Sequence, residues 1–220
     1  MQRDIEFSVG EFYHLYTRGV ERRELFLDDD DRKRFITLLR VCNGDKPVVF
    51  KIVRGLPLDE VDVGESLVAI GAYCLMPNHV HILVREIREQ GISRFAEKLF
   101  TAYSMYFNRR YDRKGRLYES VFQARHVQSD EYLKYLYAYI HLNPVKLVEP
   151  DWKETGISDR LAARRFLESY TVSSFQDFRH YNRKEKIILS PKHFPEYFKK
   201  RFEFDDFIND WLNFRGLPLA

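Results

Sequence analysis

The sequence predicts a chain of mixed helices and strands built around a β-hairpin. Hydrophobic residues make up 45% of its 220 residues, which is enough for a packed core. Two apolar runs rich in β-branched residues, 67–76 and 79–84, flank the turn dipeptide Pro77-Asn78. Elsewhere apolar residues recur at helical spacing. These observations indicate one domain, or one domain with an extension.

Before the hairpin, the aromatic and β-branched run from Phe12 to Thr17 predicts a first strand. The acidic run Asp28 to Asp31 is typical of a helix N-terminus, and the apolar spacing from Phe35 to Val41 continues that helix, which is expected to end near Asn43-Gly44. We expect a short strand over Pro47 to Val53. A surface loop is expected over Arg54 to Glu65.

After the hairpin, helical spacing predicts a helix over Ser93 to Asn108, and residues 117–127 are expected to include a strand. Ser129 is a good helix cap, and the helix that it starts is expected to end near Asn143, before Pro144. Further helices are expected at 158–169, 174–181, 195–201 and 205–214. The last of these is expected to dock through Phe207, Trp211 and Phe214.

Two histidines begin the second strand of the hairpin. Side chains alternate along a strand, so His79 and His81 project from one face while Val80, Ile82 and Val84 fill the other. Two imidazoles side by side on a rigid strand form half of a site for a divalent metal ion. The alternative is that they are ordinary, partly exposed histidines with common hydrogen bonds.

The helix after Ser129 is rich in tyrosine. At about 100° per residue, its core face consists of Leu133, Leu136, Tyr137 and Ile140. One flank of that face holds Tyr132, Tyr135, Tyr139 and Asn143, and His141 lies on the opposite flank. Tyr139 and Asn143 are therefore neighbours one turn apart, close enough to serve one site. The alternative for each tyrosine is a purely structural role.

A basic segment follows the helix that ends near Asn108. Five of the eight residues from Arg109 to Arg116 are basic: Arg109, Arg110, Arg113, Lys114 and Arg116. Such a segment is suited to contact phosphates, with Tyr111 as a stacking platform. The alternative is a solvated loop.

The remaining composition restricts the function classes. The net charge of +3 permits a nucleic-acid partner without requiring one, and the 15% aromatic residues offer stacking surfaces. Cys42 and Cys74 form no C-x-x-C pair, which favours a reducing, cytoplasmic setting. The charged first residues do not resemble a signal peptide, and no apolar run is long enough to predict a membrane span.

Taken together, these motifs resemble the single-tyrosine HUH transposases, and most of all the branch associated with repeated extragenic palindromes. The resemblance covers about residues 12–178. It is carried by Tyr13 to Gly19 with Phe26, by Ala72 to Val84, by Tyr103 to Tyr118 and by Asp130 to Val145, with a weaker match at 170–175. The most specific elements are Met-Pro-Asn-His-Val-His and, later, Tyr-Ile-His-Leu-Asn-Pro-Val.

The resemblance implies an α+β fold of the ferredoxin-like or RRM-like type, an antiparallel sheet with flanking helices. It implies His79, His81 and Asn143 as ligands of Mg²⁺ or Mn²⁺, and Tyr139 as a catalytic nucleophile that forms a 5′-phosphotyrosine. The implied partner is single-stranded DNA with hairpin elements, cleaved and rejoined beside the hairpin. Many relatives have Gly-Arg where this chain has Ser120-Val121, which affects local DNA contacts.

On this basis we expect a catalytic domain over residues 1–150 and a helical extension over 151–220 that packs on it. Arg18 and the basic segment, including Tyr111, are the expected DNA-binding residues. The alternative function is a non-catalytic hairpin-binding regulator on the same fold, and a metal-dependent RNA hydrolase is a more remote one. The sequence is compatible with a monomer or a homodimer.

Overall fold

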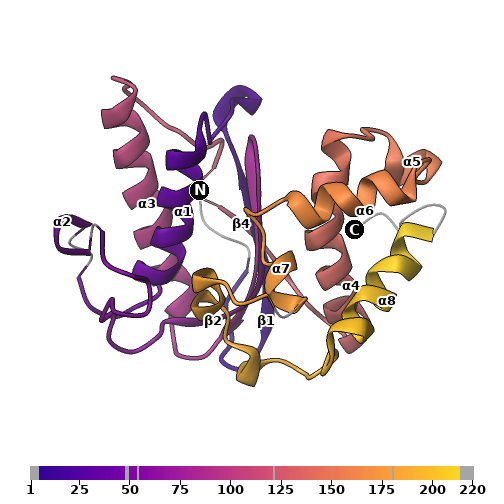
Figure 1. The fold of residues 1–220 in the computed structure, drawn as a ribbon. Helices are drawn as coiled ribbons and strands as arrows, with labels where there is room; N and C mark the ends of the chain where they lie inside the picture. The colour runs from indigo at the N-terminus through magenta and orange to yellow at the C-terminus, as the bar shows by residue number, and fades with distance from the viewer. Residues whose placement is uncertain (1–4, 48–49, 54, 121, 180, 214–220) are drawn as a thin grey trace.

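A computed structural model of the chain describes residues 5–47, 50–53, 55–120, 122–179 and 181–213. Within these ranges the centre is a four-stranded antiparallel sheet with strand order β2-β3-β1-β4. Helices cover both of its faces (Figure 1). The predicted α+β fold with an antiparallel sheet and flanking helices is therefore confirmed. The strands are β1 (Phe12–Arg18), β2 (Val68–Met76), β3 (His79–Glu86) and β4 (Gln123–His126).

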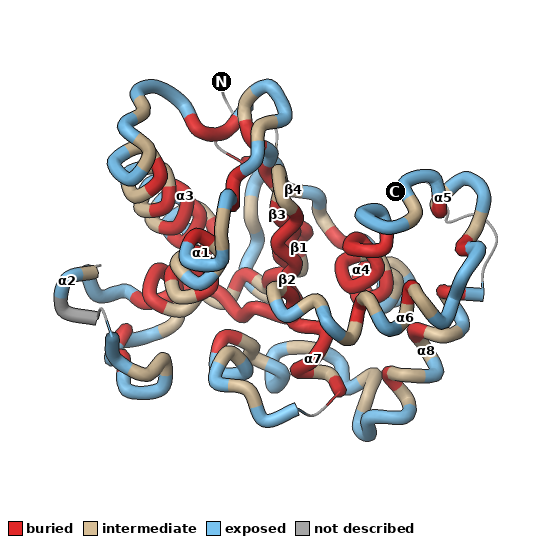
Figure 2. Tube along the Cα trace, turned by 45° about the horizontal axis from the view of Figure 1, so that its top comes forward, coloured by how far each residue is buried: buried red, intermediate tan, exposed pale blue. Residues whose placement is uncertain are grey.

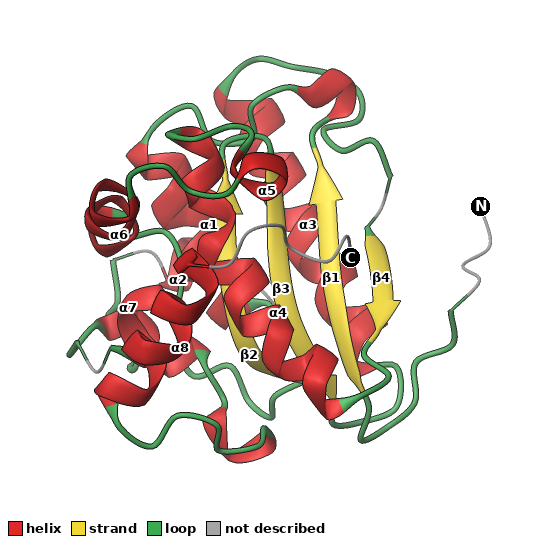
Figure 3. Cartoon of the chain, turned by 90° about the vertical axis from the view of Figure 1, so that its right-hand side faces the viewer, coloured by secondary structure: helices red, strands yellow, loops and turns green. Residues whose placement is uncertain are grey.

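Each face of the sheet has its own helices. Helices α1 (Asp29–Val41) and α3 (Gly91–Arg110) cover one face, and α4 (Asp130–Leu142) packs on β2 and β3 on the other (Figures 1 and 3). Alternation along β3 sends Val80 and Ile82 into the core below α1 and α3, whereas Leu83 belongs to the core below α4. Buried backbone accordingly runs through the sheet and along the facing sides of the helices (Figure 2).

The hairpin turn is held in place from outside. Pro77 and Asn78 connect β2 to β3, and Met76 faces His79 across the ladder. The amide of Leu25 donates to the carbonyl of Pro77 at 2.7 Å, and the amide of Gly19 donates to the carbonyl of Asn78 at 2.9 Å. The start of β3 is thus fixed by the segment that follows β1, which limits the movement of His79.

The helices begin where the capping residues predict. The side chain of Asp28 accepts from the amide of Asp31 at 3.0 Å, and the side chain of Ser129 accepts from the amide of Tyr132 at 3.1 Å. Each bond satisfies a backbone donor that the first helical turn leaves without a partner. The predicted starts of α1 and α4 are confirmed.

The chain after α4 wraps around the α4 side and one edge of the sheet. Its helices are α5 (Trp152–Thr155), α6 (Arg160–Ser169), α7 (Phe175–Phe178) and α8 (Arg201–Asn213). On the outer edge of β2, the amide of Leu75 donates to Val172 at 3.1 Å and the amide of Ser174 donates to Tyr73 at 3.0 Å. These bonds cover an edge that would otherwise offer open backbone groups for pairing.

Short helices complete the described elements. They are α2 (Phe50–Val53) and the 3₁₀ turns η1 (Val20–Arg22), η2 (Asn143–Leu147), η3 (Lys184–Ile188) and η4 (Pro191–His193). The expectation of a strand over Pro47 to Val53 is wrong for Phe50–Val53, which is helical. The ring of Phe50 packs on the core, with the Arg34 guanidinium 3.4 Å from its centroid. Packing has overridden the β propensity of this run.

The end of the chain also differs from expectation. Residues 195–200 form no helix, because the rings of Tyr197 and Phe198 both lie 5.9 Å from Tyr137 and hold this segment against α4. The helix expected at 174–181 ends at Phe178. The residues of α8 that are fully buried are Phe204, Ile208 and Leu212; the predicted Phe207 and Trp211 are half-buried, and Phe214 lies outside the described residues.

In the described part of the chain, no helix is both long enough and apolar enough to span a membrane.

Candidate functional site

The two histidines of the hairpin face α4, at the end of the sheet where β3 begins. In the β1–β3 ladder, Arg18 pairs with His79 and Tyr16 pairs with His81. The His79 and His81 rings lie 5.0 Å apart. His81 is buried and His79 is half-buried, so one edge of the pair is accessible. The predicted common face of the pair is confirmed.

Hydrogen bonds orient both imidazoles. Nδ1 of His79 lies 2.7 Å from Oδ1 of Asn78, and Nδ1 of His81 lies 2.8 Å from Nε2 of His14 on β1. Since the amide oxygen of Asn78 can only accept, Nδ1 of His79 carries the proton and its Nε2 has a free lone pair. The bond to His14 likewise leaves Nε2 as the outer nitrogen of His81.

The histidines are uncharged at neutral pH. Burial lowers the pKa of His79 to about 4, with a further contribution from Arg18. Burial lowers the pKa of His14 to about 3, and burial followed by the charge of His14 places the pKa of His81 well below its usual value. Neutral imidazoles are the form that binds metal ions.

Tyr139 approaches the histidines from α4. Its ring centroid lies 5.5 Å from that of His81 and 5.7 Å from that of His14, edge-on in both cases. Tyr135, one turn earlier, is 5.9 Å from Tyr139 and packs on Trp211. Burial raises the pKa of the Tyr139 phenol, while hydrogen bonding to Asn143 and the charge of Arg18 oppose that rise. The phenol is therefore protonated at neutral pH.

Asn143 comes directly after α4, where Pro144 follows it and the chain changes to a 3₁₀ turn. Its side chain is buried, and its Nδ2 donates to the backbone carbonyl of Tyr139 at 2.8 Å. That bond fixes the amide and leaves Oδ1 as a free acceptor oxygen. Tyr139 and Asn143 thus form one unit, as their spacing predicts.

These side chains line one cavity of about 330 Å³ between the sheet and α4. His79, His81, Tyr139 and Asn143 all contribute to its wall. The other lining residues are Tyr16, Thr17, Arg18, Glu119, Ser120, Gln123, Lys146 and Lys153. The cavity therefore brings together all four residues predicted as metal ligands and nucleophile.

The cavity offers a set of donor atoms that suits a divalent metal ion. Among the described residues there is no group of three or more His, Cys, Asp or Glu suited to a metal. The set in the cavity is instead two neutral imidazoles and one amide oxygen, each oriented by a hydrogen bond. Such a set fits a divalent ion that keeps positions open for oxygen ligands of a substrate.

The residues of the basic segment differ in what they contact. The backbone after it is tied to β1, since the amide of Glu119 donates to the carbonyl of Arg18 at 3.0 Å. Arg110 pairs with Asp28 at 2.7 Å and with Asp31 at 3.0 Å, and the Tyr111 hydroxyl donates to Asp31 at 2.8 Å.

The other basic residues of the segment are freer. Arg113 donates to Asn108 at 3.0 Å. Arg109, Lys114 and Arg116 are exposed and form no ion pair with a described residue. The predicted role of the segment in DNA binding stays a prediction, and these three side chains are the ones available for it.

Sequence reasoning missed three residues at this site: His14, Lys146 and Lys153. His14 was detectable in principle, because alternation places it on the same face of its strand as Tyr16 and Arg18. For the two lysines the sequence contained no signal.

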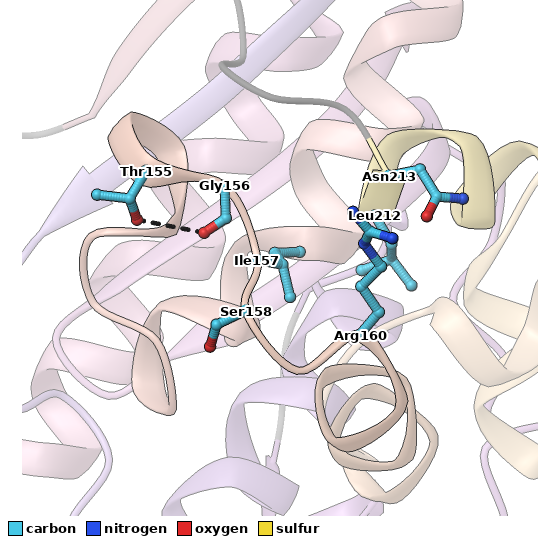
Figure 4. A pocket seen from close by; sticks show the side chains of 7 residues that line it. All are labelled: Thr155, Gly156, Ile157, Ser158, Arg160, Leu212 and Asn213. Atoms are coloured by element: carbon cyan, nitrogen blue, oxygen red, sulfur yellow. Dashed lines mark hydrogen bonds between the residues drawn. The ribbon is translucent and has the colours of Figure 1, made fainter.

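Another cavity, of about 350 Å³, lies between α6, α8 and the loop after α5 (Figure 4). It is lined by Thr155, Gly156, Ile157, Ser158, Arg160, Leu212 and Asn213. These residues include no histidine, carboxylate or tyrosine, and we assign no chemistry to this cavity.

Comparison with known proteins agrees with the fold and the motifs. Residues 63–143, which include the histidine pair and extend through Tyr139 to Asn143, match the family model described as "Transposase IS200 like". The resemblance to IS200-like transposases is therefore confirmed for this segment.

A solved structure adds evidence on the fold. It is that of a REP-associated tyrosine transposase bound to a REP hairpin, with a TM-score of 0.50 and 14% sequence identity. The alignment covers 89% of this chain and 91% of that one, so the similarity of fold extends into the region after α4. No curated protein sequence matches the chain.

Proposed function

We propose that this protein cleaves and rejoins single-stranded DNA beside a hairpin, with Tyr139 as the nucleophile. The observation that carries the proposal is a single cavity lined by a phenol, two oriented neutral imidazoles and an oriented amide. The match to IS200-like transposases supports DNA as the substrate. The REP hairpin bound by the structural neighbour supports a hairpin as the recognised element.

Three residues would hold a divalent metal ion, Mg²⁺ or Mn²⁺. They are His79 and His81 through Nε2, and Asn143 through Oδ1, the atoms that their hydrogen bonds leave free. When bound, such an ion would polarise the scissile phosphate and offset the charge that develops on it. The neutral state of both imidazoles means that no proton has to leave them first.

Tyr139 supplies the attacking oxygen. As its phenolic O–H proton is lost, the oxygen forms a bond to the scissile phosphorus and the bond to the 3′ oxygen breaks. The products are a phosphotyrosine linked to the 5′ end of the downstream fragment and an upstream fragment whose 3′ oxygen takes up a proton to become a free 3′-OH. Water is not consumed, so attack by a 3′-OH on the phosphotyrosine rejoins a strand.

The substrate strand must be unpaired to bring a phosphate into a cavity of this size. Arg18 lines the cavity, and Arg109, Lys114 and Arg116 are exposed on the basic segment. We propose that these four contact DNA phosphates. In this proposal Arg110 and Tyr111, bonded to Asp28 and Asp31, hold the segment against α1.

We further propose that residues 1–150 form the catalytic domain and that 151–220 form an extension packed on it. The backbone bonds that join β2 to Val172 and Ser174 support this packing of the extension. So does the apolar cluster that α4 shares with α6 and α8, which includes Leu142, Leu167 and Phe204.

The experiment compares Tyr139→Phe with the matched control Tyr135→Phe, one turn earlier on the same flank of α4. End-labelled single-stranded hairpin DNA is incubated with each protein and Mn²⁺, and adducts that survive SDS are counted. The wild type and Tyr135→Phe should form an adduct on the 5′-phosphate side, and Tyr139→Phe should form none. Only one hydroxyl is lost, so folding and hairpin affinity should be preserved.

Cleavage that persists in Tyr139→Phe, or peptide mapping of the adduct to Tyr135, would overturn the assignment of the nucleophile. Hairpin binding by the wild type without any adduct would favour the non-catalytic regulator.

A further inference from the structure

Lys153 enters the cavity from the region after α4. It lies on α5, whose first residue, Trp152, is buried in the cluster formed by α4, α6 and α8. The Nζ atom of Lys153 is 4.3 Å from the centroid of the Tyr139 ring, and the side chain lines the cavity together with His79 and His81. Lys153 forms no ion pair with a described carboxylate. Its charge is therefore not neutralised within the described part of the protein.

The surroundings of Lys153 favour an anion. Burial is the main cause that lowers the pKa of His14, His79 and His81, and the charge of Lys153 contributes to the lowering of each. Burial, followed by the charge of Lys146, lowers the pKa of Lys153 itself to about 8. The cavity wall contains three cationic side chains, Arg18, Lys146 and Lys153, and one carboxylate, Glu119. A cavity with this excess of positive charge is suited to a phosphate.

We propose that Lys153 binds the scissile phosphate of the DNA strand and holds it against Tyr139. The proposal rests on the function proposed above and adds a substrate-contacting residue from outside the segment that matches the family model. An ammonium group fixed beside the reacting phosphate stabilises the charge that spreads over its oxygens during transfer. Lys153 lies over the face of the Tyr139 ring, so a phosphate bound to its ammonium group would be held near the nucleophile.

A structural role for Lys153 would have a different signature. If the ammonium served only to pack α5 on α4, removing its charge would lower stability and leave the reaction rate of the folded protein unchanged. Lys134, which lies on α4 like Tyr139, offers a matched comparison. Its Nζ lies 5.9 Å from the Tyr197 ring and 5.7 Å from the Phe207 ring, and Lys134 does not line the cavity.

The experiment uses the full chain and measures single-turnover cleavage of hairpin DNA at saturating protein with Mn²⁺. The variants are Lys153→Met, which keeps the apolar stem, Lys153→Arg, which keeps the charge, and Lys134→Met as the control. Lys153→Met should slow cleavage by about 10²-fold or more, the effect of removing one preorganised donor at a reacting group. Lys153→Arg should recover much of the rate, Lys134→Met should match the wild type, and Mn²⁺ affinity should stay unchanged in all.

A second measurement needs no variant of Lys153 and no cleavage of DNA. Tyr139→Phe protein is treated with an amine-specific acetylating reagent, with and without saturating hairpin DNA, and modification is read by peptide mass spectrometry. Lys153 should be protected by DNA, whereas Lys134 should react equally in both samples.

Cleavage by Lys153→Met at the wild-type rate, or acetylation of Lys153 that DNA does not reduce, would overturn the proposal. If wild-type protein forms no adduct, the proposed function fails, and the acetylation result still decides whether Lys153 contacts DNA.

Discussion

His14 provides a quantitative test of how the cavity would hold a metal ion. Its Nε2 lies 2.8 Å from Nδ1 of His81, and both rings are buried. Replacing His14 with Leu removes the only described partner of His81 Nδ1. The ring of His81 then loses the contact that selects its tautomer and orientation.

The size of the effect follows from the burial of that nitrogen. A buried polar group left without its partner costs about 1–3 kcal/mol. Groups that support a metal-ligating histidine in this way typically contribute about 10–100-fold to metal affinity. The two figures agree, since a tenfold change corresponds to about 1.4 kcal/mol. We therefore expect the Mn²⁺ dissociation constant of His14→Leu to rise by about 10–100-fold.

Calorimetric titration with Mn²⁺ measures this constant, and thermal unfolding in EDTA measures stability separately. A His79→Ala/His81→Ala double variant defines the signal without the site. His14→Gln, which keeps a polar group, should retain more affinity than His14→Leu. His141→Gln is the control. His141 is also buried, but it lies on the other flank of α4, where its Nε2 is 2.8 Å from Oγ of Ser174.

An unchanged Mn²⁺ affinity in His14→Leu would refute the idea that His14 orients His81. Undiminished binding in the double histidine variant would remove the whole site from consideration.

Two further predictions concern the basic segment and the region after α4. Neutralising Arg109 and Arg116 should flatten the salt dependence of DNA binding, by about 0.7 in log–log slope for each lost single-strand contact, whereas Arg110→Ala should lower the melting temperature because it breaks the pairs with Asp28 and Asp31. An unchanged slope in a filter-binding salt titration would mean that the segment is merely solvated. Asp177 is buried, and burial raises its pKa from 3.8 to about 6. The folded state then holds the proton more tightly, so stability falls as pH rises from about 4 to 6 and stays reduced above that range. Asp177→Asn should raise the free energy of unfolding near neutral pH, by at most about 3 kcal/mol for a shift of this size, and should change little near pH 4. Urea unfolding at both pH values checks this, and an equal change at both would contradict it.

Much of the site could be predicted from the sequence because its information is local. The alternation of a strand places His79 and His81 on one face, and the helical repeat places Tyr139 beside Asn143. Asp28 and Ser129 mark helix starts through bonds to backbone groups three residues away. Each inference depends on neighbours within about one turn or one pleat, so no tertiary knowledge was needed.

The errors have the same physical origin. Phe50–Val53 is helical and residues 195–200 are not, because aromatic side chains there pack on distant parts of the core. Local propensity is weaker than that packing. The basic segment shows the same effect: its composition is evident in sequence, but Arg110 is engaged by acidic residues about eighty positions earlier.

Only the tertiary structure decided what surrounds the predicted residues. It brings His14 on β1 to His81 on β3, covers the edge of β2 with Val172 and Ser174, and places Lys153 over the ring of Tyr139. The sequence by itself determined which side chains share a face, since that depends on backbone repeat. Which faces meet depends on how burying apolar surface brings separate elements together, and no local pattern encodes that outcome.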